Sequence, residues 1–112
     1  MNAPDTASLG VGPVLQSTPL ARTIITAIEE ANDDVVVRDE GAYLRVLAPR
    51  VCRLSRAAIE ATTGSSVEFP GDLEVLMSSF AGQMRLNEYG AVWWLATEAP
   101  PEPPAPPMRT GA

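Results

Sequence analysis

Apolar and polar residues follow one another with changing periods along this chain, and each period predicts an element. The apolar run over 11–15 predicts a strand, and Pro13 would place that strand at a sheet edge because proline has no N–H to donate to a second neighbour. Thr18 suits a helix N-cap with Pro19 in the first turn. Apolar residues then recur at helical spacing, so we expect a helix that ends near Asn32.

Two antiparallel hairpins are predicted further along the chain. Valine-rich alternation over 34–39 and a second alternating run over 42–48 enclose a turn at Glu40–Gly41. A longer hairpin covers 72–95, with its turn at 87–90. Together these hairpins supply most of the predicted strands.

A second helix is expected between the hairpins. An extended segment over 51–54 leads into it, Ser55 is its predicted N-cap, and Gly64 is its predicted left-handed stop. The predicted order is therefore β-α-β-β-α-β-β. This order is typical of a small α/β (α+β) domain in which two helices pack on one antiparallel or mixed sheet.

Both ends of the chain differ in composition from the middle. Residues 1–10 are small and polar without periodicity, and they predict a flexible arm. From Glu98 onward the sequence contains six prolines and little to bury, so residues 98–112 are expected to be a disordered, extended tail. A length of 112 residues leaves room for one domain, which we place at 11–97.

The composition leaves few groups for catalysis. The chain contains neither histidine nor lysine, and it has a single cysteine, Cys52. The usual general bases, Schiff-base amines and transition-metal ligands are thereby missing. A helical-bundle diiron site needs Glu-x-x-His pairs, so any iron would have to belong to a partner. We expect a protein without catalytic residues, metal or cofactor.

Charge and hydropathy limit the classes of partner that the protein is expected to bind. A net charge of −6 argues against binding to nucleic acid. The N-terminus lacks a basic flank and an apolar signal core, and the longest apolar run is too short to cross a bilayer. One cysteine offers no internal disulfide. These features predict a soluble cytoplasmic protein without membrane contact.

The stretch over 72–95 reads DLEVLMSSFAGQMRLNEYGAVWWL, and it resembles the C-terminal hairpin of a known family. The family is that of the small coupling (effector) proteins of soluble diiron monooxygenases, nearest the alkene and aromatic-hydrocarbon (toluene, isoprene) group. Residues 79–83 carry most of the resemblance, and 11–13 and 41–46 match further strands of the family. The matching segments keep the family's order over roughly 11–96.

The resemblance implies a function without chemistry of its own. Proteins of this family bind the hydroxylase component above its diiron centre. They shift active-site helices, control the entry of substrate and electrons, and couple NADH use to hydrocarbon oxidation. A Rieske-type ferredoxin and a flavin reductase would belong to the same system.

The resemblance also supplies candidate contact residues for the hydroxylase. They are Ser79, Phe80, Gly82 and Gln83, which lie in the segment that resembles the family's docking region. Taken alone, the position of Gly82 favours a β-bulge, which lets the sheet curl, over a contact role.

Asn32 is a further candidate. It follows Glu29 and Glu30 in the last turn of the first predicted helix, where the helix dipole disfavours negative charge. An ordinary C-cap explains an asparagine at this position without a partner. By its placement, however, Asn32 resembles a family asparagine on the face that meets the hydroxylase.

The only predicted basic cluster is formed by Arg45, Arg50, Arg53 and Arg56. Arginine binds carboxylates bidentately, so Arg45 and Arg53 are candidate contacts for an acidic protein surface. The absence of lysine from the whole chain explains the choice of arginine equally well.

Two other function classes remain open at this point. The chain could be an unrelated adaptor that adds the edge of its long hairpin to a partner's sheet. A small hydrolase or transferase acting through Ser55 or Ser78 is the weaker alternative, since an evident base is missing. Trp93 and Trp94 must point to opposite faces of their strand, so one is expected in the core and the other partly exposed or covered by a helix.

Overall fold

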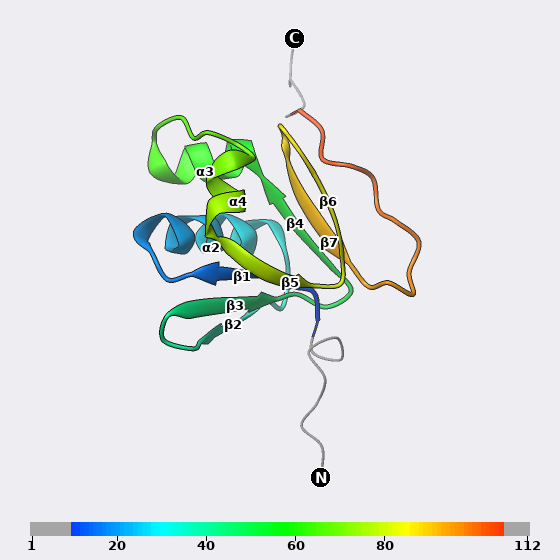
Figure 1. Cartoon of the computed structure of the whole chain (residues 1–112). Helices are drawn as coiled ribbons and strands as arrows, with labels where there is room; N and C mark the ends of the chain where they lie inside the picture. The colour runs from blue at the N-terminus through cyan, green and yellow to red at the C-terminus, as the bar shows by residue number, and fades with distance from the viewer. Residues whose placement is uncertain (1–9, 107–112) are drawn as a thin grey trace.

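Two antiparallel sheets and three helices make up the computed structural model of the chain, which describes residues 10–106 (Figure 1). The first sheet has the order β2-β3-β1-β5, with β2 at Val36–Asp39, β3 at Tyr43–Leu47, β1 at Gly12–Gln16 and β5 at Met77–Ala81. The second sheet has the order β4-β7-β6, with β4 at Val51–Ser55, β7 at Gly90–Trp94 and β6 at Gln83–Asn87.

The helices are α2 at Pro19–Ala31, α3 at Arg56–Thr63 and α4 at Gly71–Leu76. The predicted caps of the first two are confirmed. The Thr18 hydroxyl accepts a hydrogen bond from the Ala21 N–H at 3.0 Å, and the Ser55 hydroxyl accepts one from the Ala58 N–H at 3.0 Å. Gly64 ends α3 in the left-handed conformation, with φ +74°. Local sequence signals therefore fix where these helices begin and end.

The mixed α and β class and the predicted order of elements are confirmed, with two differences in detail. The strands form two sheets instead of one, and residues 71–76 form a helix where the start of the long hairpin was expected. In this helix Leu73 and Leu76 share the buried side while Val75 points outward. A strand would have placed Leu73 and Val75 on one face.

Pro13 lies in the middle of the first sheet, so the prediction that β1 is an edge strand was wrong. The strand pairs with β5 on one side and with β3 on the other. The β1–β3 ladder runs over residues 14–16 and has a separate bridge at Val11 and Ala48. The proline falls in the gap between these pairings, where its missing N–H interrupts a ladder that already has a break.

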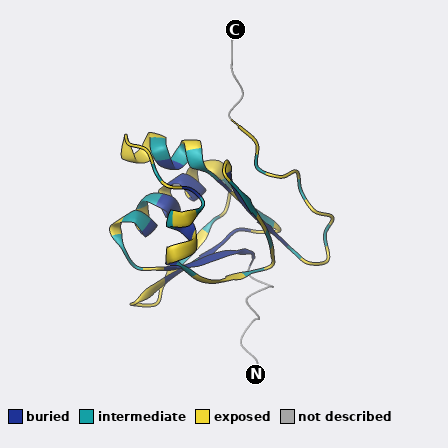
Figure 2. Ribbon diagram, turned by 45° about the horizontal axis from the view of Figure 1, so that its top comes forward, coloured by how far each residue is buried: buried dark blue, intermediate teal, exposed yellow. Residues whose placement is uncertain are grey.

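A single hydrophobic core joins the two sheets and the helices (Figure 2). Its largest fully buried side chains include Trp93 on β7, Leu15 on β1 and Ile24 on α2. Helix α2 packs against both α3 and β4. The helices and the inner faces of both sheets therefore share one interior.

Among residues 10–106, we find no helix that is long and apolar enough to cross a membrane.

Candidate protein-contact surface

Gly82 forms a corner where the chain passes from the first sheet into the second. It is the only residue between β5 and β6, and its φ is +96°. A methyl group here would lie 2.5 Å from the Trp94 carbonyl oxygen and 2.8 Å from Val11 Cγ1. The predicted break in the strand pattern is thus present. It marks the passage from one sheet to the other and is not a bulge within a single sheet.

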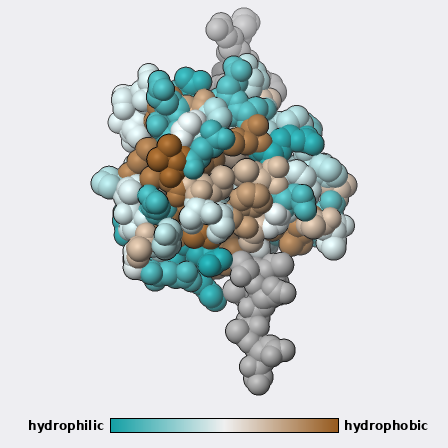
Figure 3. Space-filling model, viewed as in Figure 1, coloured by the Kyte–Doolittle hydropathy of each residue, from teal (hydrophilic) through white to brown (hydrophobic). Residues whose placement is uncertain are grey.

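The helix and strand before this corner carry exposed apolar side chains. Val75 on α4 is 78% exposed and Phe80 on β5 is 41% exposed, with exposed serines at 78 and 79 between them in sequence. We call these four residues the α4–β5 surface. Hydrophobic residues gather over α4 and β5 in the space-filling view (Figure 3).

Two of the predicted contact residues lie on the outer face of the first sheet. Val14 on β1 pairs with Arg45 of β3 on one side and with Ser79 of β5 on the other. Arg45 also pairs across to Arg38 of β2, and its Nε lies 3.5 Å from the Glu40 carboxylate. The fold therefore brings Arg45 and Ser79 onto one face, separated by a single valine.

Two other predicted residues lie on the outer face of the second sheet. Gln83 on β6 is opposite Trp94 of β7, and Arg53 on β4 is opposite Val92 of β7. Both side chains are exposed. They share this face with Trp94. The sequence predicted that one of the two tryptophans would be partly exposed or covered by a helix, and Trp94 is the one outside the core.

Asn32 connects the end of α2 to the outer edge of β4. Its Nδ2 donates to the carbonyl oxygens of Ile28 at 2.7 Å and Arg53 at 2.8 Å, and its Oδ1 accepts from the Arg53 N–H at 2.9 Å. The side chain therefore ends the helix and also occupies the position of a neighbouring strand at Arg53. Because both N–H groups are used within the chain, Asn32 has only one lone pair left for a partner.

The four arginines predicted as one basic cluster do not all lie together: Arg45 is on the first sheet, whereas Arg50 and Arg53 line one cleft beside the second. Arg45 pairs with Glu40, Arg50 with Glu98 and Arg56 with Glu60, each in an ion pair. Most of the positive charge of this group is therefore balanced by nearby carboxylates. Arg53, on the second sheet, lines the same cleft as the Arg50–Glu98 pair.

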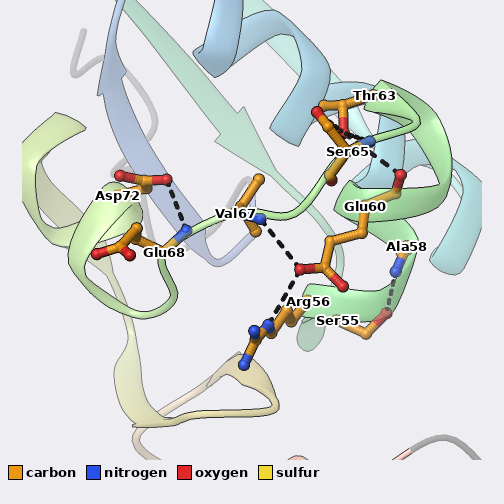
Figure 4. A network of polar contacts seen from close by, with 9 residues as sticks. All are labelled: Ser55, Arg56, Ala58, Glu60, Thr63, Ser65, Val67, Glu68 and Asp72. Atoms are coloured by element: carbon orange, nitrogen blue, oxygen red, sulfur yellow. Dashed lines mark hydrogen bonds and ion pairs between the residues drawn. The ribbon is translucent and has the colours of Figure 1, made fainter.

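A polar network orders the loop between α3 and α4 (Figure 4). The Glu60 carboxylate accepts hydrogen bonds from the Val67 N–H at 3.0 Å and from Arg56 Nε at 3.3 Å. These two contacts, the Val67 hydrogen bond first, lower the pKa of Glu60. At the other end of the loop the Asp72 carboxylate accepts from the Glu68 N–H at 3.0 Å. The network holds the loop that leads into the α4–β5 surface.

Groups that could carry out chemistry have structural roles in this fold. The Ser55 hydroxyl caps α3, and the Ser78 hydroxyl lies 3.4 Å from the Val14 carbonyl oxygen. Burial raises the pKa of the Cys52 thiol to about 12. Across residues 10–106, His, Cys, Asp and Glu do not gather in any group of three that could hold a metal ion.

Residues 10–94 match the MmoB/DmpM family. The chain belongs to this family. The chain is also similar to the effector subunit of the alkene monooxygenase system of Xanthobacter autotrophicus (strain ATCC BAA-1158 / Py2). This relative is 36% identical over 86 residues, which cover 75% of the present chain and 84% of the relative.

Solved structures share the fold seen here. A chain in a structure of the phenol hydroxylase–regulatory protein complex has a TM-score of 0.68 at 20% identity, and covers 75% of this chain and 95% of its own length. A chain in another structure of such a complex has a TM-score of 0.64 at 21% identity, with 75% and 98% covered. At this identity the likeness concerns the fold alone.

The predicted contact residues thus divide between two places on the MmoB/DmpM fold. Ser79, Phe80 and Gly82 lie along β5 and the corner, whereas Asn32 and Arg53 lie together at the edge of β4. Sequence reasoning did not identify Val75, because alternation of polar and apolar residues there suggested a strand. The helix that exposes Val75 depends on burial of Leu73 and Leu76, which the sequence pattern alone does not reveal.

Proposed function

We propose that this chain is the non-catalytic effector protein of a multicomponent soluble diiron monooxygenase, and that its partner is the hydroxylase component. The observation that carries the proposal is the match to the alkene monooxygenase effector subunit over 84% of that protein's length. The MmoB/DmpM match over residues 10–94 supports it. A ferredoxin and a reductase would belong to the same system without contacting this surface.

We place the hydroxylase contact on the α4–β5 surface and the adjoining corner. Val75 and Phe80, five residues apart in the sequence, both present apolar area to solvent, and apolar side chains at the centre of an interface contribute most of the affinity. From Ser79, Arg45 extends the surface across the outer face of the first sheet. Gln83 continues it past the corner.

The effect on the partner follows from linkage. A protein without reactive groups changes another protein's reaction by binding two of its conformations with different affinities. The shift in the hydroxylase equilibrium cannot exceed that difference in binding free energy, typically about 1–3 kcal/mol. A rigid surface is sufficient for this role.

The test is a reconstituted reaction containing hydroxylase, ferredoxin and reductase from the same source. Product formed per NADH consumed is measured with and without this protein, using propene, isoprene and toluene. A saturable rise in product per NADH is expected. No change with any of these substrates, together with no detectable complex with the hydroxylase, would contradict the effector role and favour the adaptor alternative.

Two matched variants test the location of the contact. Val75→Asp places a charge on the α4–β5 surface, whereas Val36→Asp places one on β2, where valine is also exposed, at 51%. We expect Val75→Asp to weaken hydroxylase binding about tenfold or more, as for a central interface residue, and Val36→Asp to have little effect. Equal effects of the two substitutions would remove the contact from this surface.

A further inference from the structure

The outer face of the second sheet buries two apolar side chains outside the main core. Val92 is 1% exposed and Trp94 is 9% exposed, and neither belongs to the core cluster that contains Trp93. On this face Val92 lies between Arg53 and Arg85, whose guanidinium is 5.8 Å from the centre of the Trp94 ring. An aromatic ring flanked by arginines is therefore covered by some other part of the chain.

The cover is the proline-rich segment after β7. Ala99 and Pro101 line a cleft of about 170 Å³ together with Trp94 and neighbouring residues of β4. Pro104 and Ala105 line a second cleft of about 230 Å³ together with Val92 and other residues of this sheet. In Figure 1 the segment runs as an irregular coil along the side of the second sheet.

Specific polar contacts hold both parts of the segment. Glu98 forms an ion pair with Arg50, near the point where the segment leaves the sheet. Further along, Asn87 Nδ2 donates a hydrogen bond to the Pro104 carbonyl oxygen at 2.9 Å. This second contact fixes the far end of the segment to the sheet, because it joins the side chain at the end of β6 to a backbone group 17 residues away in the sequence.

The exposure of the segment repeats every three residues. Glu98, Pro101 and Pro104 are half-buried, and every residue between them and up to 106 is exposed. A polyproline II helix has three residues per turn, so in that conformation these three residues would form one ridge. Domains that bind proline-rich ligands dock such a ridge into an aromatic-lined groove.

We propose that the outer face of the β4-β7-β6 sheet is a binding site for a polyproline II segment, and that residues 98–106 of the same chain are its resident ligand. Trp94 and Val92 supply the apolar floor of the site. Arg50 fixes one end of the ligand through Glu98, and Asn87 fixes the other through Pro104. The site does not depend on the proposed effector role.

The attachment of the ligand sets the affinity that the site needs. A ligand joined by a short linker has an effective concentration of about 1 mM. A site with a Kd of about 0.1 mM would then be filled in roughly nine molecules of ten, and a tenfold weaker site in about half of them. The free state would become about five times more populated.

The first test compares two double substitutions in the full chain. Pro101→Ala/Pro104→Ala changes the buried ridge, and Pro100→Ala/Pro103→Ala changes two exposed prolines of the same segment. The readouts are acrylamide quenching of tryptophan fluorescence and the indole N–H resonance of Trp94, with the fully buried Trp93 as internal reference. Only the ridge variant should expose Trp94. Equal responses of the two variants, or none from either, would overturn the proposal.

The second test adds the ligand in trans. A chain that ends at Thr97 keeps the whole MmoB/DmpM match, and its fold is checked by circular dichroism. A synthetic peptide of residues 97–106 should bind this shortened chain with a Kd below about 1 mM, because a weaker site would stay mostly empty in the full chain. The full chain should bind the peptide more weakly than the shortened chain, because its own segment competes for the site. Absence of saturation with the shortened chain would refute the site.

Discussion

At Gly82 a nearby carbonyl oxygen and the backbone conformation together decide which residue the chain can carry. An added methyl group meets the Trp94 carbonyl oxygen at 2.5 Å, and the backbone is already in the left-handed region. We expect Gly82→Ala to lower the free energy of unfolding by at least about 2 kcal/mol, because strain from positive φ and a backbone clash combine. Chemical denaturation measures the change.

Gly41 provides the matched control for this substitution. Its φ is +84°, but an added methyl group would meet no atom within 4 Å. Gly41→Ala should therefore cost only the conformational term, about 1 kcal/mol. If the two variants are destabilised equally, the corner is not as tight as its geometry indicates.

Two substitutions at Asn32 distinguish the contribution of its donating amide nitrogen from that of its accepting oxygen. Asn32→Ala removes two hydrogen bonds at the edge of β4 and one to the last turn of α2, and should cost about 1–3 kcal/mol of stability. Asn32→Asp keeps an acceptor for the Arg53 N–H but places a carboxylate against two carbonyl oxygens. We expect the aspartate to be at least as destabilising in thermal unfolding, and an aspartate variant of wild-type stability would contradict the role of the amide.

Single residues were the most predictable level of this structure. Thr18, Ser55 and Gly64 act through neighbours only three or four residues away, so the sequence alone identifies them. Gly82 and Asn32 were also identified as special positions. Their partners, Trp94 and Arg53, lie far along the chain, and their roles became visible only in the fold.

At the scale of elements, the local sequence pattern led to wrong predictions where tertiary packing determines the type of an element or its place in a sheet. Residues 71–76 alternate like a strand but form α4, because a helix buries Leu73 and Leu76 together. Pro13 suggests an edge strand but lies in a central one, in a gap of the β1–β3 ladder. Both outcomes depend on neighbours that are distant in sequence.

The loop between α3 and α4 should respond to acid through Glu60. Its pKa is lowered in the folded state, so the ionised carboxylate stabilises the fold above the ordinary glutamate pKa of 4.5, and this contribution is lost as the pH falls below it. Glu60→Gln should therefore be less stable than the wild type at pH 7. The difference should close as the pH falls toward about 3, where the carboxylate is protonated in both the folded and the unfolded chain. A gap in thermal stability that is independent of pH would contradict this account.

At the scale of the whole molecule, Cys52 should report global unfolding. The thiol is fully buried and its pKa is raised to about 12, so the reactive thiolate is scarce in the folded protein. We expect modification by a thiol reagent to be slow in native buffer and to reach the rate of a free cysteine in denaturant. Rapid labelling of the native protein would mean that β4 opens on its own.

The division of the strands into two sheets could not be predicted from the sequence. Hairpin signals identify which neighbouring strands pair, but β1 pairs with β5 across more than sixty residues of chain, as the register of Val14 with Ser79 records. The path of the proline-rich segment is equally non-local. Its composition predicts an extended backbone, while its position depends on Trp94 and Asn87.

The corner at Gly82 also bears on how the molecule comes apart. One continuous run of chain supplies β5 to the first sheet and β6 to the second, and one core lies beneath both. Neither sheet can therefore separate without pulling on the other. Amide hydrogens in the centres of β1 and β7 should exchange with solvent through the same opening event and with the same free energy, so the two sheets behave as a single cooperative unit.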